Sequence, residues 1–119
     1  MVRSDRRTAF QLADKLALAA YKHTAGMPPD ERFGLTMQIR RAAVSVPSNI
    51  VEGCSRHSET DYLRFLDIAL GSACELEYQL SLALRLGYLH QEKHHEVASL
   101  AAQTAKTLNA LVRSLRRRA

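Results

Sequence analysis

The stretch HQEKHHE carries the side chains best suited to metal chemistry. His90 and His94 are four residues apart, a spacing that places two imidazoles on one face of a helix. The metalloprotease pattern also requires glutamate directly after the first histidine, and Gln91 stands there. Glu92 and His95 match one Glu-x-x-His unit of a di-iron bundle, but a second unit is missing. We therefore expect a solvated polar segment, with no metal ion.

Cysteine offers the other familiar route to catalysis. Cys54 and His57 are the one thiol and imidazole close together in the sequence, but no third group or oxyanion donor accompanies them. Glycine-rich phosphate loops are absent, so we expect no enzyme and no cofactor. Cys54 and Cys74 are predicted to be buried small residues. With no signal-peptide pattern at the start, they indicate a reduced, cytoplasmic protein.

Length and charge narrow the remaining classes. The 119 residues fit a single domain, 1–119, large enough to fold without a disulfide or metal. No apolar run approaches the ~18 residues that a membrane span requires, so no membrane partner is expected. The formal net charge is +5, because 17 basic residues outnumber 12 acidic ones. That excess mildly favours an anionic partner.

Loop signals are sparse and divide the chain into four segments. They cluster around Gly26 and Pro29, between Gly53 and Ser58, and at Gly87. The remaining segments are all predicted to be helical, at 5–25, 30–54, 58–86 and 91–117. Pro29 and the two acids after it suit the first turn of the second helix. Ser58 with Asp61 resembles a capping box for the third helix, and Gly87 suits its left-handed end.

Apolar residues recur at steps of three and four in each segment, which is helical spacing. The first seam is Leu12, Leu16, Ala19 and His23; the second is Leu35, Ile39, Ala42, Val46, Ile50 and Gly53. The third seam is Tyr62, Leu66, Ala69, Ala73, Leu76, Leu80 and Ala83; the fourth is Val97, Ala101, Thr104, Leu108, Leu111 and Leu115. Short connections make consecutive helices antiparallel. The sequence therefore predicts an all-α, antiparallel up-down-up-down four-helix bundle.

Pro47 interrupts the second helix. A proline inside a helix removes one backbone donor and costs ~3 kcal/mol, so a kink is predicted near this residue.

Polar residues form a stripe beside the apolar seam of the second helix, and a second polar line lies on the third helix. The proposed network consists of Gln38, Arg41, Ser45, Asn49, Glu52, Ser72 and Glu75. Such a stripe at the edge of a core requires hydrogen-bond partners. We interpret it as a structural network that sets the register of the bundle or a subunit contact. Arg41 and Glu75 are a plausible ion pair, and a small-ligand site stays open as the alternative.

The third helix carries more apolar residues than one seam needs. The surplus includes Phe65, Ile68, Leu82 and Leu86. Because every helix of a four-helix monomer has a solvent side, this surplus predicts self-association. A wide core with a few exposed leucines is the alternative.

The second and third segments resemble a known family. The runs FGLTMQIRRAAVSVPSNIVEG and YLRFLDIALGSACELE are similar to the four-helix-bundle proteins encoded in intervening sequences of bacterial 23S ribosomal RNA genes. The most specific parts are the pattern Q-x-R-R-A-x-x-S-x-x-x-N-I-x-E-G and the later Gly71, Ser72 and Glu75. The resemblance extends from the first helix to about Leu89.

This resemblance implies a four-helix protomer, commonly assembled as a ring-like homopentamer. The chain is also similar to the accessory protein of diversity-generating retroelements, whose basic pentameric barrel binds nucleic acid and a reverse transcriptase. The partners implied are further copies of the chain, RNA or DNA, and a reverse-transcriptase-like protein. For the intervening-sequence proteins themselves, the resemblance implies no defined activity.

The predicted topology gathers arginines at one end of the bundle, where the chain start, the loop between the second and third helices, and the chain end meet. The arginines assigned to this end are Arg3, Arg6, Arg7, Arg56, Arg64, Arg113, Arg116, Arg117 and Arg118. Against Asp5, Glu52, Glu59 and Asp61 they leave an excess of five positive charges, the whole net charge. Arginine favours bidentate contact with phosphate, so we predict sequence-independent binding of RNA or DNA.

Two other interpretations stay open. Arginines near helix C-termini also stabilise the helix dipole by ~0.3 to 1 kcal/mol each, and basic tails are often only solubilising. A protein adaptor that uses the apolar surplus of the third helix is the alternative function.

Overall fold

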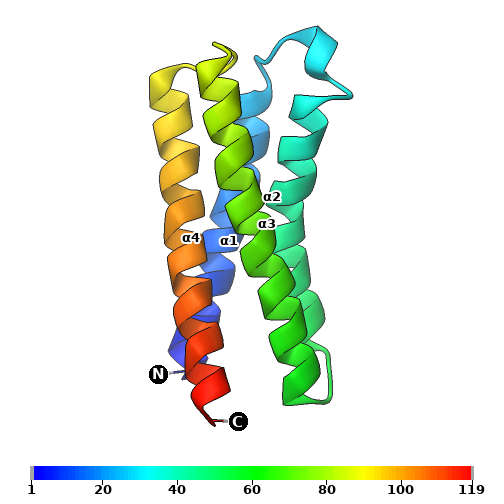
Figure 1. Ribbon diagram of the computed structural model, residues 1–119, viewed down its shortest axis with the longest axis vertical. Helices are drawn as coiled ribbons and strands as arrows, with labels where there is room; N and C mark the ends of the chain where they lie inside the picture. The colour runs from blue at the N-terminus through cyan, green and yellow to red at the C-terminus, as the bar shows by residue number, and fades with distance from the viewer. Residues whose placement is uncertain (1, 119) are drawn as a thin grey trace.

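The protein is an all-α four-helix bundle with no strand in the part of the chain that the structure describes (Figure 1). This computed structural model describes residues 2–118, with the side chains of residues 6–118. Its helices are α1 (Val2–Thr24), α2 (Leu35–Cys54), α3 (Glu59–Arg85) and α4 (Gln91–Arg118), and a short 3₁₀ helix, η1 (Pro29–Glu31), lies before α2. The predicted fold class is confirmed.

The four helices form a ring in which the backbone of each lies close to two others. Helices adjacent in sequence pack together and α1 also packs against α4, while the backbones of the diagonal pairs, α1 with α3 and α2 with α4, do not approach each other closely. The chain runs up α1, down α2, up α3 and down α4, so both termini and the α2–α3 connection lie at the lower end in Figure 1. Short connections such as those between α2 and α3 and between α3 and α4 place consecutive helices antiparallel and side by side.

Local signals explain where α3 begins and ends. The Ser58 hydroxyl accepts a hydrogen bond from the Asp61 backbone N–H at 3.1 Å, as the capping signal predicts. Gly87 has φ of 80°, the left-handed conformation expected just after a helix.

The predicted start of the second helix is wrong by about one turn. Pro29 opens η1, and α2 begins only at Leu35 because Gly34 has a non-helical backbone. The carboxylate of Glu31 accepts a hydrogen bond from the Leu35 N–H at 2.8 Å, which satisfies a free donor at the start of α2.

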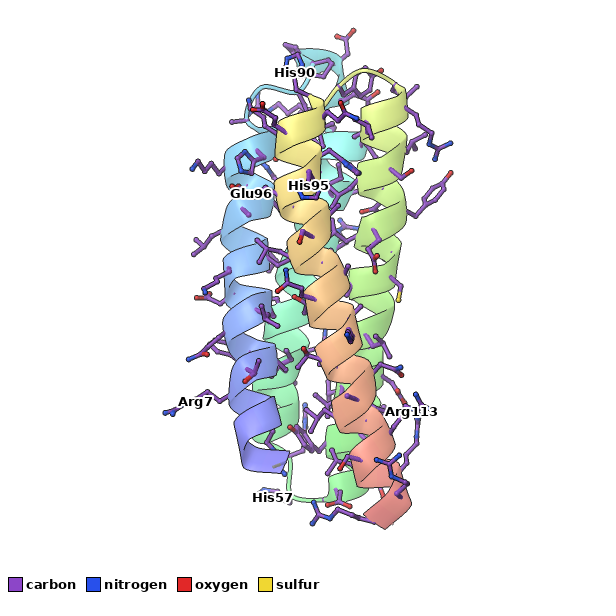
Figure 2. The ribbon with its side chains drawn as sticks, turned by 90° about the vertical axis from the view of Figure 1, so that its left-hand side faces the viewer. Arg7, His57, His90, His95, Glu96 and Arg113 are labelled. Carbon is purple, nitrogen blue, oxygen red and sulfur yellow. The ribbon has the colours of Figure 1, made fainter. Side chains whose placement is uncertain are left out.

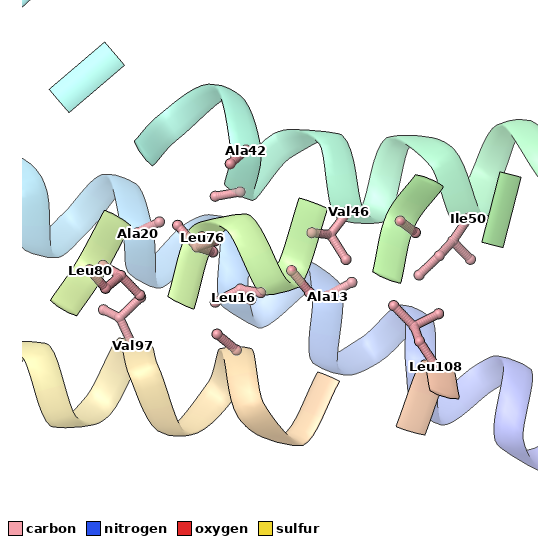
Figure 3. Packing of buried hydrophobic residues seen from close by; sticks show 14 of the residues in the cluster. Ala13, Leu16, Ala20, Ala42, Val46, Ile50, Leu76, Leu80, Val97 and Leu108 are labelled. Atoms are coloured by element: carbon pink, nitrogen blue, oxygen red, sulfur yellow. The ribbon is translucent and has the colours of Figure 1, made fainter. Parts of the chain in front are cut away.

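The core follows the predicted seams on three of the four helices. Every seam residue of α2, α3 and α4 is buried, and Figure 3 shows several of these side chains meeting between the helices. On α1 the predicted face is wrong except at Leu16. The buried hydrophobic residues there are Ala9, Ala13, Leu16 and Ala20, whereas Leu12 and Ala19 are only half-buried. Small alanines on this face let α1 pack closely against its neighbours.

Pro47 lies inside α2, which continues as a helix on both sides of it. The kink stays a prediction. None of the described helices is long and apolar enough to span a membrane.

Candidate nucleic-acid interface

Eight of the nine predicted arginines lie at one end of the bundle, and we call this end the basic pole. They come from the start of α1, the α2–α3 connection, the first turns of α3 and the end of α4, and all eight are exposed. The side chain of the ninth, Arg3, lies outside the described residues. Figure 2 shows Arg7, His57 and Arg113 toward this end, and His90, His95 and Glu96 toward the opposite one. The basic pole is defined by Arg6, Arg7, Arg56, Arg64, Arg113, Arg116, Arg117 and Arg118.

Three of these arginines pair with surface carboxylates. Arg56 pairs with Glu52, Arg116 pairs with Asp67, and Arg64 lies 4.0 Å from an oxygen of Asp61. The Arg116 pair corrects the predicted charge balance, because it adds Asp67 to the carboxylates of the basic pole. The eight described arginines thus face four carboxylates, an excess of four positive charges. Exposed pairs of this kind contribute only ~0–1 kcal/mol each and leave their arginines accessible.

The other arginines are not neutralised. Arg6, Arg7, Arg113, Arg117 and Arg118 have no carboxylate partner among the side chains that the structure describes. These guanidiniums keep their donors for an external anion.

Aromatic rings hold several arginines in place. Two guanidinium groups lie over the Phe65 ring, that of Arg56 at 4.8 Å and that of Arg64 at 4.6 Å from the ring centroid. Arg6 lies 4.8 Å from the centroid of the Tyr62 ring. Cation–π contacts of this kind restrict the side chains and so reduce the entropy lost when a ligand binds.

A cavity of about 240 Å³ opens at the basic pole beside the first turn of α3. We call it the polar cavity, and its walls are Arg6, Gly53, Cys54, Arg56, His57, Ser58, Glu59 and Tyr62. Tyr62 is 7% exposed, and its buried hydroxyl has no hydrogen-bond partner among the described residues. Burial raises the pKa of Tyr62 to about 12, and the nearby Cys54 thiol adds to this effect while Arg6 opposes it. The hydroxyl therefore remains a donor at neutral pH.

Gly53 allows Tyr62 to occupy this position. A Cβ on Gly53 would lie 3.0 Å from the Tyr62 ring atom Cδ1 and 3.0 Å from the Cβ of Phe65. The missing side chain thus lets α3 approach α2 closely at the wall of the polar cavity.

A second hollow of about 450 Å³ lies between α1 and α2. We call it the apolar groove, and it is lined by Arg6, Arg7, Phe10, Ile50, Val51 and Cys54. Val51 is 57% exposed and Phe10 is 38% exposed, so the groove presents apolar surface beside positive charge.

The predicted polar stripe is assembled in part. The hydroxyls of Ser45 and Ser72 lie 2.8 Å apart, which links α2 to α3. The Asn49 amide donates to the Ser45 hydroxyl at 2.9 Å and to its carbonyl at 2.8 Å. Glu52 pairs instead with Arg56, in the basic pole.

Arg41 and Glu75 line one hollow of about 300 Å³, together with Gln38, Ser45 and Ser72. The predicted Arg41–Glu75 pair is absent among the ion pairs of the described residues. Gln79, which also lines this hollow, donates to Glu75 at 3.3 Å. The predicted stripe thus divides into separate groups of bonded side chains rather than forming one continuous network.

The predicted oligomer residues divide into two kinds. Ile68 is 41% exposed and Leu86 is 52% exposed, as a contact surface would require. Leu82 packs partly against the core. The Phe65 ring lies against the guanidinium groups of Arg56 and Arg64. Gly71, on the same helix, has open space where a side chain would be.

The cysteine prediction is wrong, because Cys54 and Cys74 are both exposed free thiols. Each falls one position beyond a buried seam residue, and the helical period turns that position outward.

The histidine-rich segment begins α4 at the end opposite the basic pole. No group of three or more potential metal ligands occurs among the described residues. Glu96 accepts a hydrogen bond from His23, which lowers the pKa of that exposed carboxyl. Burial lowers the pKa of His94, and His95 contributes to the shift.

Sequence reasoning missed the polar cavity and the apolar groove. Tyr62 was identified as a seam residue, and its polar hydroxyl in an otherwise aliphatic seam was the available signal.

The fold and the pole define a basic, antiparallel four-helix-bundle protein. Residues 6–110 match the family described as 23S rRNA-intervening sequence protein, and the chain belongs to this family. The resemblance noted in the sequence is thereby confirmed.

A solved structure from Bacteroides thetaiotaomicron, a protein of unknown function from the S23 ribosomal protein family, is similar to this chain. The two superimpose with a TM-score of 0.84 at 24% identity, covering 92% of this chain and 98% of that one. At this identity the likeness shows the fold alone. A search of curated proteins found no match.

Proposed function

We propose that this protein binds nucleic-acid phosphates through the basic pole, as a non-enzymatic homo-oligomer. The observation that supports this most is the gathering of eight exposed arginines at one end of a bundle. Five of them lack a carboxylate partner among the described side chains. Guanidinium groups contact phosphate bidentately and release counterions from the polyanion, which makes such binding sequence-independent and sensitive to salt.

Assembly would multiply this charge. Ile68 and Leu86 supply exposed apolar surface on α3, and the family resemblance suggests a pentamer. A reverse-transcriptase-like partner is also suggested by that resemblance alone. The family description names 23S rRNA, so fragments of this RNA are the first probe.

The test is an electrophoretic mobility series with 23S rRNA fragments and DNA of equal length, at increasing salt. The test variant replaces Arg113, Arg117 and Arg118 by serine. None of these arginines forms an ion pair with a carboxylate within the described part of the chain. We expect affinity to fall steeply with salt and the variant to lower the log–log slope by about three.

The matched control removes three cations from the opposite end, replacing Lys22, Arg32 and Lys93 by serine. This variant has the same net charge, so a loss confined to the first variant identifies the basic pole. Absence of binding at low salt, or equal losses in both variants, would show the proposal to be wrong.

A protein adaptor is the second candidate, favoured by the exposed Ile68 and Leu86. It predicts a partner that stays bound after nuclease treatment and is lost when both residues are replaced by glutamine.

A further inference from the structure

The polar cavity and the apolar groove are two halves of one hollow region at the basic pole. They share two walls, Arg6 and Cys54. One half is lined mainly by polar groups and the other mainly by apolar groups, and Arg6 stands between them. A ligand that fills both halves would carry an anionic group and an apolar group close together.

We propose that this region binds one unpaired nucleotide, with its phosphate in the polar cavity and its base in the apolar groove. The inference deepens the proposed function and rests on it: the basic pole would prefer single-stranded nucleic acid to duplex.

The phosphate half is lined by several hydrogen-bond donors. Tyr62 lines the polar cavity, and its buried hydroxyl lacks a hydrogen-bond partner among the described residues, a cost that a phosphate oxygen would remove. The N-terminus of α3, capped by Ser58, opens into the same cavity with its positive dipole end. Arg6 and His57 line it as well.

Two features of the polar cavity oppose an anion. Glu59 is among the lining residues, and Arg56 is already paired with Glu52. Glu59 is exposed, so water and salt screen its repulsion of a bound anion. A hydrogen bond to the buried Tyr62 hydroxyl is screened less. The balance of the lining groups favours a phosphate.

The base half offers a stacking surface. Phe10 and Val51 are partly exposed on facing helices, and Ile50 closes the floor at 2% exposure. Arg7 lies at the rim, where a guanidinium can contact the next phosphate of a strand. A base in a duplex is already stacked and paired, so only an unpaired base can enter.

The test compares a single-stranded oligoadenylate RNA with a duplex that carries the same number of phosphates. One adenine of the single strand is replaced by 2-aminopurine, whose fluorescence reports unstacking. The chain has no tryptophan, so no indole emission interferes. We expect the single strand to bind more tightly than the duplex, with a fluorescence change on binding.

Two substitutions examine the halves separately, each with a matched control. Tyr62→Phe removes only the hydroxyl, and Tyr78→Phe does the same at an exposed tyrosine of α3. Val51→Ser removes apolar surface from the groove, and Val44→Ser does so elsewhere on α2. We expect Tyr62→Phe and Val51→Ser each to weaken single-strand binding about tenfold and to leave duplex binding unchanged. The fluorescence change should disappear in Val51→Ser.

The possible failures are distinguishable. Equal binding of single strand and duplex, unaffected by either substitution, would overturn the nucleotide site and leave the proposed function standing. If neither nucleic acid binds at low salt, the proposed function fails. In that case, titration with adenosine 5′-monophosphate, followed by NMR, tests the nucleotide site by itself. Absence of binding would overturn the site, whereas binding that both Tyr62→Phe and Val51→Ser weaken would support it. Tyr62→Phe should fold normally, because it removes a buried polar group without a partner.

Discussion

Tyr62 links the stability of the bundle to pH at the scale of one residue. Its pKa is raised from 10.0 to about 12, chiefly by burial, so the folded state holds the phenolic proton more tightly than the unfolded chain does. Because the pKa of Tyr62 is higher in the folded state, the protonated hydroxyl contributes to the free energy of unfolding. This contribution is complete below about pH 10 and is lost as the pH rises toward 12.

We therefore predict that the free energy of unfolding of the unmodified chain falls more steeply than that of Tyr62→Phe between pH 10 and 12. The phenylalanine variant has no proton to lose at this position. Urea denaturation across this range measures both curves. Parallel curves would show that Tyr62 titrates alike in the folded and unfolded states.

At the scale of elements, α1 shows how a helix rich in alanine chooses its buried face. Several of its faces are similarly apolar, and packing selects the one with Ala9, Ala13, Leu16 and Ala20. The smaller residues let α1 lie close to α2 and α4, while Leu16 fills the space between them.

Leu16→Ala and Leu12→Ala test this choice of face. Leu16 is fully buried, so its truncation should cost ~2–5 kcal/mol of unfolding free energy. Leu12 is half-buried on the flank, and the same change there should cost clearly less. Thermal and urea unfolding compare the two variants. A larger loss at Leu12 would favour the face predicted from sequence.

At the scale of the whole molecule, α3 exposes apolar surface to solvent on one side of the bundle. Ile68 and Leu86 lie five helical turns apart on the same face of the helix, and Ser72 and Glu75 lie between them. A surface of this kind fits contact with another copy of the chain.

We predict that the 13.3 kDa chain sediments as an oligomer at micromolar concentration. Replacing Ile68 and Leu86 together by glutamine should shift it toward the monomer, because the contact would lose its apolar side chains. The control is Leu18→Gln, a substitution of an even more exposed leucine on α1. An unmodified chain that is monomeric, or an equal effect of the control, would contradict this prediction.

The sequence by itself determined the four helices, three of their buried seams and the end at which the arginines gather. These features depend on local signals, namely helical spacing, the Ser58 cap, Gly87 and short connections, and each acts within a few residues. The short connections then fix the antiparallel order.

The tertiary structure alone decided which distant side chains meet. It paired Arg116 with Asp67, left Arg41 without the predicted Glu75 partner and turned α1 to its alanine face. It also brought α1, the end of α2 and the first turn of α3 together around Tyr62, which created the polar cavity. The reason is physical: spacing along one helix fixes which side chains share a face, but the rotation and height of each helix against its neighbours depend on packing the whole core.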